Sequence, residues 1–239
     1  MSEIYENMSE MQNEVYEPQE QPEQTEQKDT VIVFCVIGNQ FSEKFLRNWT
    51  ELFGYCLKNN IQPVLSNFNG DNTYIYKNGC LLAKINEENN VPFQGNLDYD
   101  YIVWIHENMM FSVDIFKALY EQDKQVISTT STNNFSLNKL NFIQNIDFNN
   151  PSQGEFIDKN DVKQLSENGT TIKVDFFNFG YVMMKRGVLE KIGYPWFNAH
   201  KQSNDLKGDV FFCQRCKECN IDLYVDLKTY TPTERKLTV

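Results

Sequence analysis

The chain lacks the basic excess and the long apolar runs that mark several large classes of protein. Its 22 Lys and Arg residues are outnumbered by 33 Asp and Glu residues, and the formal net charge is −11. A chain of this kind has no basic footprint for a phosphate backbone, so we expect no nucleic-acid partner. No apolar run approaches the roughly 18 residues that a membrane span needs, and no basic region with an apolar core opens the chain. We therefore expect no membrane span and a cytoplasmic location.

Histidine is also scarce, and cysteine is present without signs of disulfide use. His106 and His200 are the two histidines, and we interpret His200 as a solvated loop residue. The six cysteines are interpreted as buried free thiols, because the chain is large and has no secretion signal. Cys213, Cys216 and Cys219 form a C-x-x-C-x-x-C pattern that suggests iron–sulfur or zinc, but they fall in a predicted helix with no fourth ligand following. A cysteine-ligated metal protein is kept as a third hypothesis.

The negative charge is concentrated in residues 1 to 29. This Glu- and Gln-rich segment holds nine of the 33 acidic residues and one of the 22 basic ones. It has few large aliphatic residues and cannot bury enough apolar surface to offset its ordering entropy, so we predict disorder. It is either a solubilising tail or, over Ile4 to Tyr16, a short amphipathic helix on a partner. Residues 30 to 239 carry 24 acidic and 21 basic residues. They are predicted to form one folded domain.

The domain opens with a strand, a helix and a second strand. Val31 to Ile37 is a short apolar run, which predicts a buried strand. Ser42 is the expected N-cap of a helix that ends at Asn59-Asn60, since large apolar residues recur there at three- and four-residue spacing. A strand over Gln62 to Asn67 and a turn at Asn69-Gly70-Asp71 follow. This order predicts a right-handed βαβ unit.

Leu97 to Phe111, LDYDYIVWIHENMMF, predicts the centre of the fold. Tyr101 to Ile105 is apolar on both faces, which is typical of a strand inside a parallel sheet that helices cover on both sides. The polar triplet His106-Glu107-Asn108 follows at the carboxyl end, where open α/β sheets bind ligands. We therefore predict an α/β fold with a mostly parallel central sheet and helices on both faces.

The rest of the chain continues this alternation. A helix is predicted over Ser112 to Tyr120 and a strand over Gln125 to Thr129, and short irregular strands and loops are expected from 130 to 170. Lys173 to Phe197 predicts a strand, a turn and a short helix that Tyr-Pro-Trp closes. A helix followed by a strand is predicted over Lys207 to Asp226.

Three of these stretches resemble one family. Tyr101 to Phe111 is similar to the DxD region of GT-A glycosyltransferases, in the version found in small glycosyltransferase-like proteins of large DNA viruses and phages. Lys185 to Phe197, KRGVLEKIGYPWF, resembles that family's KRGVxEKxxYPWF, and Lys207 to Asp226 resembles its helix with Phe-Cys and closing Tyr-Val-Asp strand. The resemblance covers nearly all of residues 30 to 239. It implies a GT-A-like, Rossmann-like fold and transfer of a sugar from a UDP- or GDP-linked donor to a glycan or protein hydroxyl.

The resemblance also implies which residues bind the donor. In the family the first two strand ends hold the base and ribose, and a basic residue in the next helix lies nearby. Lys77 is the nearest equivalent of that basic residue and can supply a point charge. The implied nucleotide-sugar contacts are Gly38, Asn39, Gln40, Asn67, Asp71, Lys77, His106, Glu107 and Asn108.

The family's metal ligands are replaced in this chain. His106 and Asn108 stand where the family has two aspartates, and Thr233 stands where it has a histidine. Three interpretations stay open. A divalent cation, manganese or magnesium, is held by His106, Glu107 and Asn108; or Lys77 and helix amides stabilise the leaving group; or catalysis has been lost.

Asp209 falls on the aspartate that, in inverting members of the family, deprotonates the acceptor hydroxyl. Its other interpretation is a plain helix cap. Asn178, Gly180 and Trp196 are the implied acceptor-side residues, although Trp196 with Phe197 is equally expected as an apolar platform under the sheet. Two functions follow: an inverting glycosyltransferase, or a relative that binds a nucleotide-sugar or glycan without turnover.

Overall fold

The computed structural model describes residues 29–68, 73–84, 87, 89–133, 136–167, 169–198 and 207–234. The predicted tail lies outside this part of the chain except for Asp29. The predicted turn at residues 69 to 71, and with it Asp71, also lies outside it, as does His200. No helix among the described residues is long and apolar enough to cross a membrane.

A mixed sheet forms the middle of the molecule. Among the described residues it has seven strands in the order β2-β1-β3-β10-β4-β11-β8. Five of them run in the same direction, and β8 and β10 run against the others. The strands are β1 (Thr30–Ile37), β2 (Ile61–Asn67), β3 (Tyr101–His106), β4 (Val126–Thr130), β8 (Thr171–Val174), β10 (Tyr181–Lys185) and β11 (Leu223–Tyr230). The predicted α/β class with a mostly parallel sheet is confirmed, but one neighbour of the central strand β3 is antiparallel.

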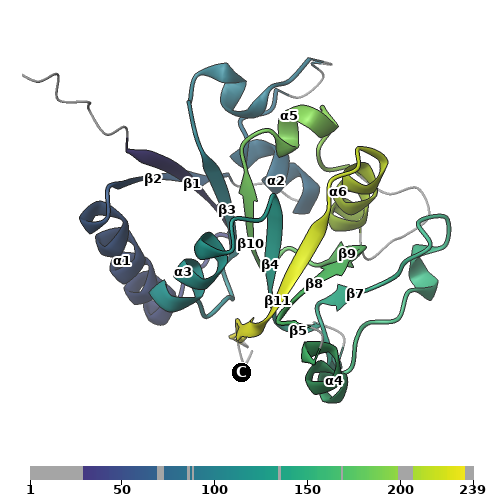
Figure 1. Cartoon of the computed structure of the whole chain (residues 1–239). Coiled ribbons are helices and arrows are strands. Elements are labelled where there is room, and N and C mark those ends of the chain that lie inside the picture. The colour runs from purple at the N-terminus through teal and green to yellow at the C-terminus, as the bar shows by residue number, and fades with distance from the viewer. Residues whose placement is uncertain are drawn as a thin grey trace, which may run out of the picture.

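Helices cover both faces of this sheet, as predicted (Figure 1). One face carries α1 (Glu43–Lys58) and α3 (Val113–Glu121), and the other carries α2 (Thr73–Cys80), α5 (Val188–Ile192) and α6 (Lys207–Glu218). The predicted helix starts are confirmed, because the hydroxyl of Ser42 accepts the N–H of Phe45 at 3.1 Å and that of Ser112 accepts the N–H of Ile115 at 3.3 Å. Each bond satisfies an N–H group that the first helical turn leaves without a partner.

Two apolar cores lie on the two faces of the sheet. Successive residues of a strand point to opposite faces, so an unbroken apolar run serves both cores. In β1, Phe34 packs with α1 and α3, whereas Cys35 packs with α2, α5 and α6. In β3, Val103 and Trp104 divide in the same way. Full burial of a side chain of this size contributes roughly 1.5 to 3 kcal/mol to folding.

The chain between β4 and β10 leaves the main sheet. It contains β5 (Thr132–Asn133), β6 (Ser136–Leu140), β7 (Phe142–Ile143), β9 (Phe176–Phe177) and α4 (Val162–Ser166), with the 3-10 turns η2 (Pro151–Gln153) and η3 (Lys159–Asp161); a further turn, η1 (Pro92–Gly95), precedes β3. The short irregular strands expected from 130 to 170 are confirmed. The segment from Lys173 to Met184 holds parts of three strands in two sheets, where the sequence predicted a strand. Asp175 separates β8 from β9, and its carboxylate accepts the N–H of Ile146.

The carboxyl ends of the five parallel strands lie along one edge of the sheet. Since β10 runs the other way, it begins at this edge, and the residues just before it lie there too. Helix α6 also begins at this edge, because it runs back to the start of β11. Four predicted site segments are therefore brought together: Gly38 to Gln40, His106 to Asn108, Asn178 to Gly180, and Asp209.

Candidate functional site

The loop after β1 is joined to the end of β3 by a carboxylate. Oε2 of Glu107 accepts the backbone N–H groups of Asn39 at 2.7 Å and Gln40 at 2.8 Å. The backbone N–H of Glu107 in turn donates to the carbonyl of Ile37 at 2.7 Å. Hydrogen bonds to an ionised acceptor contribute about 1.5 to 3 kcal/mol each, so Glu107 is a strong determinant of the shape of this loop.

Gly38 is required where this carboxylate meets the backbone. Its φ is +137°, a conformation that side chains disfavour. A Cβ built at this position would lie 2.3 Å from Oε2 of Glu107 and 2.4 Å from its Cβ. The missing side chain of Gly38 is therefore what lets Glu107 reach the two N–H groups.

Asn67 holds the end of β2 against the same loop. Its side-chain amide donates to the carbonyls of Val36 at 2.7 Å and Gly38 at 3.1 Å. The donors of this amide therefore face the protein backbone. The structure brings Asn67 to the predicted edge, but in a supporting position behind Gly38.

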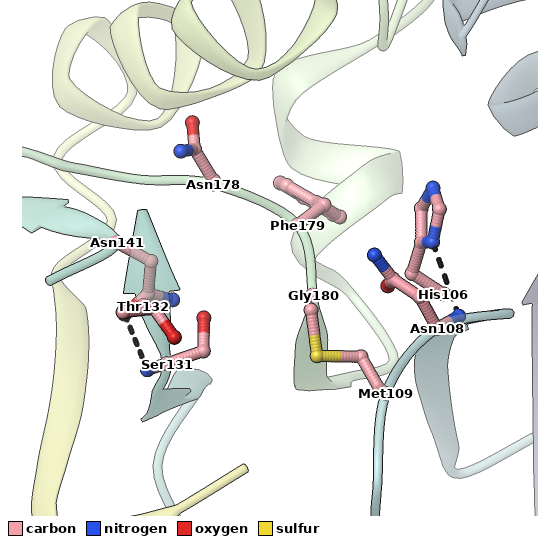
Figure 2. A pocket seen from close by; sticks show the side chains of 9 residues that line it. All are labelled: His106, Asn108, Met109, Ser131, Thr132, Asn141, Asn178, Phe179 and Gly180. Carbon is pink, nitrogen blue, oxygen red and sulfur yellow. Dashed lines mark hydrogen bonds between the residues drawn. The ribbon is translucent and has the colours of Figure 1, made fainter. Parts of the chain in front are cut away.

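A small cavity of about 40 Å³ lies between the end of β3 and the end of β4 (Figure 2). It is far below the roughly 300 to 1,000 Å³ of sites that enclose whole small-molecule ligands, so it accommodates a group rather than a nucleotide-sugar. Uncharged side chains and backbone form its walls. The lining residues are His106, Asn108, Met109, Ser131, Thr132, Asn141, Asn178, Phe179 and Gly180.

Main-chain bonds hold two sides of this cavity together. The N–H of His106 donates to the carbonyl of Gly180, and the N–H of Asn178 donates to the carbonyl of Asn141. Gly180 has little room for a side chain, because a Cβ there would lie 2.6 Å from the terminal methyl of Met109, which lies over Gly180 in Figure 2. The predicted residue Gly180 thus lies beside His106, and Asn178 lies beside Asn141.

His106 forms one wall of the cavity as a neutral imidazole. Burial lowers its pKa, the negative charge of Glu107 opposes that shift, and the positive charge of Lys77 adds to it. Nδ1 lies 3.5 Å from the backbone nitrogen of Asn108 (Figure 2). At neutral pH this wall therefore carries no charge that would attract a phosphate.

Asn108 presents a buried acceptor that lacks a donor. Its carboxamide oxygen is inaccessible to water, and no hydrogen-bond partner for it lies among the described residues. Buried polar atoms are nearly always satisfied, and an external O–H or N–H group in the cavity would satisfy this oxygen once the side chain turns it toward the cavity.

The segment after β11 passes along the same wall. The carbonyl of Asn108 accepts the N–H of Glu234 at 2.7 Å, and Met109 forms an isolated bridge with Thr233. The position that the family fills with a histidine ligand therefore lies next to residues 108 and 109, as the resemblance implied, but it carries the hydroxyl of threonine.

The two residues with the clearest predicted chemistry, Lys77 and Asp209, bind each other. Nζ of Lys77 forms an ion pair with Oδ1 of Asp209, and the ammonium is also 4.4 Å from the ring centroid of Phe179. Oδ2 of Asp209 accepts the N–H of Phe179 at 2.9 Å. The Lys77 side chain is 1% exposed and the Asp209 side chain 17%.

This pairing changes the predicted roles of both residues. Lys77 was predicted to place a point charge on a phosphate, and in this structure its charge is buried against Asp209 instead. Asp209 lies at the start of α6 on the predicted edge, but both of its oxygens already accept hydrogen bonds. These bonds use two of the roughly four lone-pair positions of the carboxylate, whose side chain is 17% exposed.

The residues at 106 to 108 do not fit a divalent cation. Hard cations take oxygen ligands, mostly carboxylates, and the one carboxylate of the triplet is engaged by the N–H groups of Asn39 and Gln40. The other two side chains offer an imidazole and an amide. Within the described ranges, no group of three or more His, Cys, Asp or Glu residues is placed to hold a metal.

The cysteines of α6 likewise form no metal-binding group among the described residues. Cys213 and Cys216 are buried in the core, Cys219 is half-buried, and all three are free thiols. Burial raises the pKa of the Cys213 and Cys216 thiols well above the usual range, which disfavours the thiolate that metals require.

Trp196 lies in the core rather than at an acceptor surface. It is 1% exposed, and its indole N–H donates to the carbonyl of Leu189 at 3.0 Å. Phe197 is equally buried and stacks on Phe212 at 5.3 Å. The structure therefore contradicts an acceptor-lining role for Trp196 and bears out the alternative, an apolar platform under the sheet.

Ser131, Thr132 and Asn141 line the cavity and were not predicted as site residues. The strand predicted over Gln125 to Thr129 ends just before the first two, and the carboxyl ends of such strands border ligand sites, which is the signal that could have found them. Asn141 belongs to the irregular region. Its carboxamide oxygen accepts the N–H of Ser131, and its amide donates to the carbonyl of Thr129. These bonds between distant segments leave no mark on the local sequence.

Comparisons with known proteins add little to this picture. No family model matches the chain, and no curated protein matches it. Among solved structures, the chain is similar to the crystal structure of A197 from STIV, with 13% identity and a TM-score of 0.48 over 88% of this chain and 96% of that one. It is also similar to the inositol-1-phosphate CTP transferase from T. maritima, with 10% identity and a TM-score of 0.39 over 86% and 89%. At these scores the likenesses carry no argument about activity.

Proposed function

We propose that the protein is a GT-A-like glycosyltransferase that binds a UDP- or GDP-linked sugar at the carboxyl edge of its sheet and transfers the sugar to a hydroxyl of a glycan or protein. The observation that carries the proposal is the uncharged cavity between β3 and β4, with the unpartnered oxygen of Asn108 in its wall. A sugar hydroxyl is an uncharged donor and fits such an atom, whereas a phosphate does not.

In this proposal one hydroxyl of the sugar enters the cavity and the nucleotide lies over the loop after β1. Gly38, Asn39 and Gln40 then contact the donor through backbone that Glu107 has already positioned. Asn178 and Gly180 face the acceptor from the start of β10. His106 and Asn108 contact the sugar rather than a metal, because the donor set of the triplet does not fit a cation.

Transfer with inversion requires a group that takes the acceptor proton. The acceptor oxygen bonds to the anomeric carbon as the bond to the diphosphate breaks, and the leaving diphosphate keeps the electron pair. The acceptor proton passes to a free lone pair on the carboxylate of Asp209.

The Lys77–Asp209 pair also favours a second candidate, a protein that binds a nucleotide-sugar or glycan without turnover. A carboxylate held by a buried ammonium and a backbone N–H is occupied in the way a structural residue is. In this case the carboxyl edge of the sheet binds the donor, with one hydroxyl in the cavity, and Asp209 fixes the start of α6.

Thermal shift with UDP and GDP, with and without Mn²⁺, tests donor binding. We expect stabilisation by at least one nucleotide that does not depend on Mn²⁺. Stabilisation that appears only with Mn²⁺ would contradict the metal-free site. If neither nucleotide stabilises the protein, both candidate functions are refuted.

Asp209→Asn separates the two candidates in a transfer assay with radiolabelled UDP- and GDP-sugars. We expect a loss of about 10²- to 10⁴-fold in turnover with nucleotide binding retained. The matched control is Asp98→Asn, which breaks the ion pair with Arg186 at the opposite edge of the sheet. Unchanged turnover in Asp209→Asn would remove it as the base, and no turnover in the native chain would leave the binding protein.

A further inference from the structure

A second, larger cleft lies in the chain that leaves the main sheet after β4. Its volume is about 410 Å³, within the roughly 300 to 1,000 Å³ of ligand sites and ten times that of the cavity between β3 and β4. It lies around the loop from Gln144 to Ile157, and none of the predicted site residues lines it. Its polar lining is Gln144, Asn145, Asp147, Asn150, Gln153 and Glu155.

The lining has the chemistry of a site for hydroxyl groups. Four amides offer both donors and acceptors, and two carboxylates offer acceptors, which together match hydroxyls that both donate and accept. Among the described residues that line the cleft there is no Lys or Arg, so a phosphate or sulfate is not favoured. Two carboxylates are few for a cation of the calcium type, which takes six to eight oxygen ligands, and the cleft is much larger than such an ion needs.

The loop that forms the cleft is built rigidly. Gly154 packs so closely that a Cβ there would lie 2.9 Å from Ile143 and 3.2 Å from Ile146. Pro151 is buried, and the N–H of Gln153 donates to the carbonyl of Asn150. A site whose backbone is already ordered loses less entropy when a ligand binds.

Asp147 is held as an ionised acceptor in this loop. Its Oδ1 accepts the N–H of Asn149 at 2.9 Å. That hydrogen bond, with a further one from the Asn150 side chain, holds the pKa of Asp147 below its usual range. The carboxylate therefore accepts hydrogen bonds throughout the neutral pH range.

The cleft is connected to the cavity by one short ribbon. Strands β7 and β9 pair over two residues each, with Asn141 and Asn178 of the cavity at one end and Gln144 of the cleft at the other. Asn141 and Gln144 are three residues apart, about 10 Å in an extended strand. The cleft and the cavity are therefore neighbouring but separate, because the four residues of the ribbon between them are buried.

We propose that the cleft around residues 144 to 157 binds an uncharged oligosaccharide. This binding does not rest on the proposed glycosyltransferase function. The ligand class is a neutral glycan, recognised by amides and carboxylates through its hydroxyls.

An NMR titration of the full-length, ¹⁵N-labelled chain tests this. The probes are neutral tri- and tetrasaccharides of glucose, galactose, mannose and N-acetylglucosamine, with inorganic phosphate and Ca²⁺ as competing chemistries. We expect at least one saccharide to shift the side-chain amide signals of Gln144, Asn150 and Gln153, and the double variant Asn150→Ala/Gln153→Ala to weaken its binding at least tenfold. Both side chains are exposed, so the variant is expected to fold; Gln153→Ala alone is the second variant.

Gln62→Ala is the matched control, because Gln62 is an exposed amide on β2, at the other end of the sheet. Equal loss in the control, shifts caused only by Ca²⁺ or phosphate, or no shift with any saccharide would each overturn the proposal. UDP and GDP titrated into the same samples keep the two proposals apart. Nucleotide binding without saccharide binding refutes the cleft alone, and the reverse refutes the donor site alone.

Discussion

Two carboxylates on the carboxyl edge of the sheet, Glu107 and Asp209, do the same structural task in different surroundings. Each accepts backbone N–H groups from another segment: Glu107 from Asn39 and Gln40, and Asp209 from Phe179. Asp209 has a buried ammonium beside it, whereas Glu107 bonds to an exposed loop. The comparison teaches that both carboxylates first of all connect segments that lie far apart in the sequence.

The largest effect is expected when the ion pair between Lys77 and Asp209 is removed. Lys77→Met leaves a mostly buried carboxylate without its ammonium, and we expect the free energy of unfolding to fall by about 3 to 5 kcal/mol. Urea denaturation measures it. Lys77→Met/Asp209→Asn is expected to recover part of the loss, because no charge then remains buried alone. The control is Lys173→Met, which breaks an exposed pair with Asp222 and should cost less than about 1 kcal/mol. Equal losses in both single variants would mean that the two pairs do not differ.

Gly38→Ala tests the Glu107 region through its backbone. The new Cβ would meet the Glu107 carboxylate at 2.3 Å and has to adopt a φ of +137°, so we expect a loss of about 1 to 3 kcal/mol. Thermal and urea unfolding, with UDP and GDP binding, provide the readouts. Gly54→Ala in the middle of α1 is the control, because a Cβ there has nothing within 4 Å and is expected to stabilise the helix by about 0.5 to 1 kcal/mol. A neutral Gly38→Ala would show that the loop does not need this close approach.

Glu107→Gln removes the negative charge of the Glu107 side chain and keeps its shape, so it tests how much the charge contributes to holding the loop after β1. We expect about 1.5 kcal/mol of lost stability, since an amide oxygen is a weaker acceptor for the N–H groups of Asn39 and Gln40. Amide hydrogen exchange at those two residues should become faster, which locates the effect. Glu51→Gln on the exposed face of α1 is the matched control and should change neither quantity. Unchanged exchange at residues 39 and 40 would refute the role of Glu107.

The smallest effect is expected at His106, whose pKa responds to the charges of both Glu107 and Asp209. Its pKa in the folded chain lies below the unfolded value of about 6.5, so the unfolded chain binds more protons as the pH falls. Stability from His106 is therefore complete above pH 6.5 and is lost below it, at up to about 1.4 kcal/mol per pH unit. We expect the unfolding free energies of the native chain and His106→Gln to diverge between pH 7.5 and 5. A parallel profile for His106→Gln would contradict the burial of a neutral imidazole.

The local sequence was sufficient for most of the fold. The two-sided apolar runs in β1 and β3 predicted buried strands, and the hydroxyls of Ser42 and Ser112 predicted where α1 and α3 begin, because these signals act within a few residues. The antiparallel insertion of β10 was not predicted, since an apolar strand of five residues does not reveal the direction of its neighbours.

The candidate site, like the fold, was predicted from the sequence only in part. The sequence by itself determined that Gly38 to Gln40 and His106 to Asn108 lie at one edge, because the carboxyl ends of parallel strands meet there, and the resemblance implied the same place for Asp209. Only the tertiary structure decided what these residues touch. It pairs Lys77 with Asp209, 132 positions apart, turns Glu107 onto the N–H groups of residues 39 and 40, and buries Trp196. The physical reason is that a charged side chain has no preferred partner until folding removes it from water, and which partner then lies within reach depends on segments far away in the sequence.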